Sequence, residues 1–153
     1  MKSDNLPRNA VFVFALALVA YIVAYSGLEA RRTRQGPWQI TFTNDAAGAP
    51  VLLINQPALA ITNVQIGFPG APLPPPTNAV TALALVEPLP VPFAVPFGQC
   101  VFMDATSLPG TLAFELFGHE IQLLPRVLTI DKVEQPWRSG ALLTLPPAKV
   151  ATK

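Results

Sequence analysis

Positive charge is missing from most of this chain. Of its ten basic residues, five stand at or before Arg34, and no Lys or Arg occurs between Gln35 and Pro125. A protein that binds nucleic acid needs clustered cations to neutralise phosphates. We therefore expect no nucleic-acid partner. Charged residues make up only 12% of the chain, a low share for a freely soluble domain. The chain is also too apolar to be disordered.

Cysteine and histidine each occur once, as Cys100 and His119. One cysteine forms no internal disulfide, and a catalytic zinc needs about three protein ligands. The zincin motif H-E-x-x-H requires a second histidine where this chain has Leu123. A blue-copper centre needs two histidines, and covalent haem needs C-x-x-C-H. We therefore expect no metal and no cofactor, and we interpret Cys100 as a small apolar core residue.

Other catalytic signatures are also missing. The sequence has no G-x-S-x-G elbow and no glycine-rich phosphate loop. A Ser-His-Asp triad would have to use His119 at a position where we expect no group to orient it. The carboxylates outside the N-terminal segment have no spacing that indicates an acid–base pair: Asp45, Glu87, Asp104, Glu115, Glu120, Asp131 and Glu134. We predict that the chain is not an enzyme.

The stretch around His119 predicts a hairpin. Apolar residues alternate with others from Leu112 to Leu116, and again at Ile121 and Leu123. Gly118 and His119 would then form a two-residue connection, with glycine at the first central position of a type II′ turn. On this interpretation His119 lies exposed at the hairpin tip.

A long apolar run lies near the N-terminus. After a short tail, 1–9, residues 10–28 are uncharged and predict one transmembrane helix, with a basic juxtamembrane linker following at 29–36. The alternative is a signal peptide cleaved near Ser26. Small residues would permit close packing against other membrane helices, although they also serve as lipid-facing filler: Ala15, Ala17, Ala20, Ala24 and Gly27. Basic residues flank both ends, and we favour a β domain on the extracytoplasmic (periplasmic) side.

In the rest of the chain, apolar residues recur with a two-residue period. Alternation in WQITFT and NVQIGF is typical of half-buried strands, with Ile61 out of register at a bulge or strand start. We expect an all-β domain over 37–145, an antiparallel β-sandwich or small barrel of seven or eight short strands, and a frayed tail at 146–153. We interpret 79–86 as a strand rather than a helix.

Nine of the eighteen prolines lie between 69 and 96. Proline lacks the backbone donor, so the loop 69–97 is expected to be extended or to lie at a sheet edge. It is either a plain connection or a docking surface. The candidate partner-binding residues are Leu89, Val91, Phe93, Val95, Phe97 and Trp137.

These expectations combine into one hypothesis about function. The chain would be a single-pass, non-catalytic accessory or structural subunit of a larger membrane complex, with a photosynthetic or respiratory complex as one example. Its partners would be other subunits and the lipid bilayer. The alternative is a membrane-anchored ligand-binding or adhesion-type β-sandwich.

Overall fold

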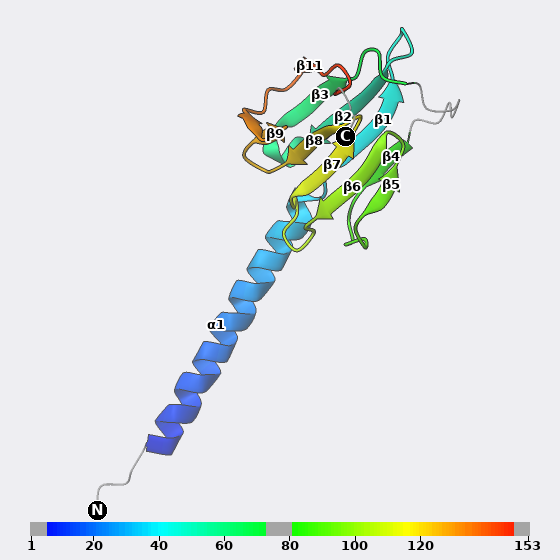
Figure 1. The fold of residues 1–153 in the computed structure, drawn as a ribbon. Helices are drawn as coiled ribbons and strands as arrows, with labels where there is room; N and C mark the ends of the chain where they lie inside the picture. Colours follow the sequence, from blue (N-terminus) through cyan, green and yellow to red (C-terminus); the bar gives the residue numbers. More distant parts are fainter. Residues whose placement is uncertain (1–5, 73–80, 149–153) are drawn as a thin grey trace, which may run out of the picture. The chain divides into compact units, whose positions relative to one another are not determined.

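An apolar helix and a β domain make up the computed structural model, which describes residues 6–72 and 81–148 (Figure 1). The chain separates into two compact units, Met1–Arg34 and Gln35–Lys153.

The helix α1 spans Leu6–Gln35. Within it, Asn9–Ala30 is a 22-residue stretch of mean hydropathy 2.3, long enough to cross a bilayer, and none of it is buried in the protein. The segment 29–36, expected as a basic juxtamembrane linker, is helical up to Gln35. Its Glu, Ala, Arg and Gln residues are helix formers, and the first helix-ending signal is Gly36, at φ +70°, followed by Pro37.

The β domain contains two sheets (Figure 1). Sheet A has the order β11-β3-β2-β1-β4. Its strands are β1 (Gln39–Asn44), β2 (Pro50–Gln56), β3 (Ile61–Gly67), β4 (Thr81–Ala84) and β11 (Leu142–Thr144), and the short 3-10 helix η1 (Pro57–Leu59) joins β2 to β3. Pairing is antiparallel except between β11 and β3, which run parallel.

Sheet B has the order β10-β9-β8-β7-β6-β5 and is antiparallel throughout. Its strands are β5 (Phe93–Val95), β6 (Gly98–Met103), β7 (Leu112–Leu116), β8 (His119–Leu123), β9 (Leu128–Ile130) and β10 (Val133–Gln135). The described residues therefore form eleven strands, more than the seven or eight expected. Four of the eleven are only three residues long, too short for alternation to reveal them.

The core lies between the two sheets, which gives a sandwich-like domain. Phe42 of sheet A meets Phe114 of sheet B edge to face, with ring centroids 6.2 Å apart. Around this contact, alternate side chains of both sheets are almost fully buried: Ile40, Leu52, Ile54, Val64, Ile66, Cys100, Leu112, Leu116, Ile121 and Leu123. The expected alternation thus places apolar residues inward from both layers.

Several local expectations are confirmed. A register shift separates the pairs of Ile54 and Gln56, and Ile61, the first residue of β3, pairs with Gln56, so the predicted irregularity at Ile61 combines a strand start with a bulge. Both strands within the proline-rich segment, β4 and β5, are edge strands, as proline requires. Of the stretch 79–86 predicted as a strand, Thr81–Ala84 is β4, and residues 79 and 80 lie outside the described residues.

Candidate functional site

His119 is the first residue of β8 and is buried, with only 9% of its surface exposed. The prediction that it lies at an exposed hairpin tip is wrong by one residue. Leu116 pairs with His119, so Phe117 and Gly118 form the turn, and both have positive φ (+50° and +84°). That is the pattern of a type I′ turn. His119 stands two residues before the inward-facing Ile121, so its side chain lies on the same face of β8. This spacing is the signal in the sequence that was overlooked.

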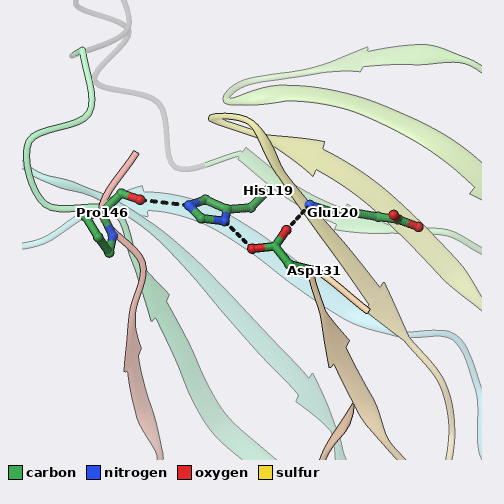
Figure 2. Close-up of polar contacts among 4 residues, drawn as sticks. All are labelled: His119, Glu120, Asp131 and Pro146. Carbon is green, nitrogen blue, oxygen red and sulfur yellow. Dashed lines mark hydrogen bonds and ion pairs between the residues drawn. The ribbon is translucent and has the colours of Figure 1, made fainter. Parts of the chain in front are cut away.

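Two acceptors hold the imidazole ring at its two nitrogens (Figure 2). Nδ1 lies 2.6 Å from a carboxylate oxygen of Asp131, and Nε2 lies 2.7 Å from the carbonyl oxygen of Pro146. The second carboxylate oxygen of Asp131 accepts the backbone N–H of Glu120 at 2.9 Å. We call His119, Asp131 and the Pro146 carbonyl the His119 clasp.

The clasp favours the doubly protonated ring. A carbonyl oxygen only accepts, so Nε2 must donate to Pro146, and an ionised carboxylate requires that Nδ1 also donate. Burial lowers the pKa of His119, but the hydrogen bond and charge of Asp131 and the bond to Pro146 outweigh it, and the pKa is raised. Burial raises the pKa of Asp131, but the bonds from His119 and from the Glu120 N–H, with the charge of His119, leave it lowered.

The C-terminal segment crosses between the sheets at this clasp. Residues 145–148, which we call the strap, follow β11 of sheet A. Leu145 donates its N–H to Gly67 in sheet A, and Ala148 donates to Phe117 in the β7–β8 turn of sheet B. With Pro146 held by His119, the strap joins the open edge of one sheet to a hairpin of the other. The prediction of a frayed tail is therefore wrong for Pro146 to Ala148, and residues 149–153 lie outside the described residues.

The His119–Asp131 pair has the orientation of a catalytic dyad, but its outer nitrogen is occupied. In a nucleophilic triad that nitrogen faces a hydroxyl or thiol, whereas here it faces a backbone carbonyl. Asp131 was missed as a partner because only the register of β8 against β9 brings the β9–β10 turn beside β8. A structural clasp explains each contact without a reaction.

Carboxylates also meet beside this hairpin. Glu115 and Glu120 are directly opposed on β7 and β8, and Gln99 donates its side-chain N–H to Glu115 at 2.6 Å. They border a shallow depression of about 460 Å³ with Gly118 and His119. Within residues 6–72 and 81–148, no three His, Cys, Asp or Glu side chains gather closely enough to hold a metal ion.

Cys100 is fully buried in β6, as predicted. Its thiol contacts the carbonyl oxygen of Phe102 at 3.4 Å. Burial raises the pKa of the thiol to about 11, against a smaller lowering by that hydrogen bond. The thiol therefore stays protonated and unreactive at neutral pH.

The structure separates the six candidate partner-binding residues by exposure. Leu89 and Val91 are exposed (46% and 42%), Phe93 and Val95 are half-buried against the core, and Phe97 is buried. Trp137 is half-buried, with its ring 5.3 Å from that of Trp38 and its N–H donated to the Leu124 carbonyl. Of the six, only Leu89 and Val91 are therefore exposed enough to offer an apolar side chain to a partner.

A groove of about 610 Å³ lies beside Trp137. Its lining comes from β3, β9, β11, the end of β10 and the chain between β10 and β11, and it includes Val64, Leu128, Arg138 and Leu143. The Ser139 hydroxyl in this wall is already engaged, since it accepts from the N–H of Thr62 and donates to the Ala60 carbonyl.

On the helix, the candidate packing residues lie on one face. Ala17, Ala20, Ala24 and Gly27 are three or four positions apart, which places them along one side of an α-helix. All four are exposed, and nothing lies within 4 Å of a Cβ built on Gly27.

No family model, no curated protein and no solved structure matches this chain. The assignment of a function therefore rests on the helix and the β domain themselves.

Proposed function

We propose that the chain is a single-pass membrane protein whose β domain serves as a non-catalytic accessory subunit of a larger membrane complex. The observation that carries this proposal is the uncovered apolar stretch of α1. Its large side chains are 50–72% exposed over Val11–Leu28, and its 22 residues match the thickness of a bilayer core. Lipid is the environment that removes such a surface from water.

Two further features, one in the β domain and one in α1, support the accessory role. The histidine, the most versatile acid–base group in the chain, has both nitrogens committed to structural acceptors. The small residues of α1 share one face, which suits contact with neighbouring membrane helices. The partners we propose are other subunits of the complex, with the domain on the periplasmic side.

Membrane extraction tests the anchor. Membranes from cells producing the full chain are washed with alkaline carbonate and then solubilised in a mild detergent. We expect the chain to resist carbonate and to enter detergent at its full mass. Release by carbonate, or a mass that lacks the helix, would show that α1 acts as a cleaved signal sequence.

Sizing of the detergent extract tests the accessory role. We expect the chain to elute with other subunits, which mass spectrometry identifies. A lone 16.3 kDa polypeptide in the detergent-corrected mass would contradict this role.

The groove beside Trp137 favours a second candidate, a membrane-anchored ligand-binding module. Its volume of about 610 Å³ lies in the range of small-molecule sites, and Trp137 and Arg138 are among its lining residues. Changes in tryptophan fluorescence on titration with a small-molecule library would favour this candidate, if Trp137→Phe abolished them and Trp38→Phe did not.

A further inference from the structure

Several chain segments meet at one end of the β domain, which we call the Trp38 end. β1 begins there, and Gln39 pairs with Ala84 at the end of β4. The indole N–H of Trp38 donates to the Gly110 carbonyl at 2.6 Å. Gly110 lies just before β7, whose first residue, Leu112, pairs with Met103 at the end of β6. The loops 85–92 and 104–111 and the turn 124–127 therefore share this end. The opposite end, with the β1–β2 turn around Asp45, we call the Asp45 end.

Exposed apolar side chains gather at the Trp38 end. In the described part of the β domain, six large hydrophobic residues are exposed. Val86 and Leu89 lie in the loop after β4, Val91 just before β5, and Phe102 near the end of β6, with exposures of 42–56%. The other two, Val133 and Leu142, lie in the edge strands β10 and β11. Four of the six thus lie at one end, a clustering that indicates an interaction surface.

Charge is distributed unevenly between the two ends. At the Trp38 end, the carboxylates of Glu87 and Asp104 are balanced by the guanidinium groups of Arg126 and Arg138. The Asp104 carboxylate is held by the N–H and hydroxyl of Thr106. Among the described residues, the Asp45 end instead carries an excess of acid, since Asp45, Glu115, Glu120 and Asp131 face only Lys132 and the protonated His119. An anionic lipid surface repels the Asp45 end and tolerates the Trp38 end.

The chain also joins the β domain to the apolar stretch at this end. From Ala30, five helical residues and four extended ones reach Gln39, a span of at most about 22 Å. We propose that the Trp38 end docks on the bilayer interface, with Val86, Leu89, Val91 and Phe102 immersed at the level of the lipid headgroups. This inference rests on the proposed membrane anchor.

The bilayer fits this patch better than a second copy of the chain. Four half-exposed side chains offer far less than the roughly 800 Å² per partner of a stable protein interface. A tethered surface, however, meets the membrane at a high effective concentration, so weak contacts suffice. Apolar side chains in a proline-rich loop also lose little conformational freedom on insertion.

Site-specific fluorescence tests the inference on the full chain. An environment-sensitive thiol probe is attached to Leu89→Cys, to Ala46→Cys in the exposed turn of the Asp45 end, or to Leu18→Cys within α1. Cys100 is buried and stays unlabelled. Each protein is reconstituted in phosphatidylcholine–phosphatidylglycerol vesicles, with nitroxide quenchers placed either at the headgroup or on the acyl chain. Unchanged tryptophan emission confirms that the label leaves the fold intact.

We expect headgroup nitroxide to quench the probe at Leu89 but not at Ala46, and acyl-chain nitroxide to quench it at Leu18. Quenching at Leu18 with none at Leu89 would overturn the docking while leaving the anchor intact. A blue-shifted but unquenched probe at Leu89 would assign the patch to a second copy of the chain instead. No quenching at Leu18 would overturn the anchor and the docking together.

Discussion

The His119 clasp makes one side chain sensitive to pH. The raised pKa of His119 means that its contribution to stability is fully present below pH 6.5 and is lost as pH rises through the raised value. The lowered pKa of Asp131 means that its contribution is present above pH 3.8 and is lost as pH falls through the lowered value. The clasp is therefore strongest between these limits.

We expect the thermal midpoint of the wild-type domain to fall as pH is raised from 6 towards 9, following deprotonation of His119. His119→Gln keeps hydrogen-bonding capacity without titrating, so its midpoint should be lower at pH 6 and should change less over the same range. The loss at pH 6 should be about 1–2 kcal/mol, since the Asp131 side chain is 48% exposed and partly screened. Parallel pH dependences in both proteins would contradict the assignment to His119.

Two glycines provide a test of local packing. A Cβ on Gly110 would lie 1.3 Å from the Asp104 carbonyl oxygen, so backbone must move to accept it. We expect Gly110→Ala to lower the free energy of unfolding by about 3 kcal/mol. Gly140→Ala is the contrasting variant, because open space surrounds Gly140 and only its left-handed φ of +74° opposes a side chain, at a cost of about 1 kcal/mol. Denaturant unfolding of both variants measures the difference, and equal losses would refute the packing argument.

Among the elements, the strap closes the sandwich. Deleting residues 146–153 removes the bonds of Pro146 to His119 and of Ala148 to Phe117, and we expect a loss of about 2 kcal/mol. Hydrogen exchange should rise in the β7–β8 turn and in β11. Deleting only 149–153 keeps both bonds and serves as the control. Equal effects of the two deletions would show that the strap contacts are not the cause.

The elements also show what sequence patterns reveal and what they miss. Alternation located β1, β3 and both strands of the β7–β8 hairpin, because each has one face in the core and at least five residues. The turn was misplaced because Gly118 suggested a type II′ turn, whereas Phe117 also takes positive φ and packs its ring 5.0 Å from Phe68. Tertiary packing stabilises a turn residue that local preference disfavours.

Long-range pairing was beyond sequence patterns. The parallel pairing of β11 with β3, and the meeting of His119 with Asp131 and Pro146, depend on register between distant segments. The sequence did reveal the exposed proline-flanked Leu89 and Val91, but not that Phe97 turns inward. A single strand carries no information about which neighbour will cover it.

For the whole molecule, the two units allow the anchor to be tested without disturbing the β domain. Val19 lies at the middle of the apolar stretch, where an arginine costs about 3 kcal/mol in a bilayer. We expect Val19→Arg to shift the chain from the carbonate-resistant to the soluble fraction, with tryptophan emission unchanged. Ala30→Arg, at the end of the stretch, should remain in the membrane. Retention of both variants would contradict a transmembrane α1.

The parallel pairing of β11 with β3 also bears on the order of events during synthesis. β3 ends at Gly67 and β11 begins at Leu142, 75 residues later, whereas α1 precedes every strand. A ribosome adds roughly 5–20 residues per second, so several seconds pass between the synthesis of β3 and that of β11, the last strand of sheet A. For a chain anchored as proposed, a targeting factor meets the apolar helix while the β domain is still incomplete. Membrane insertion and folding are then successive steps, and the domain closes only after the nascent chain is already tethered.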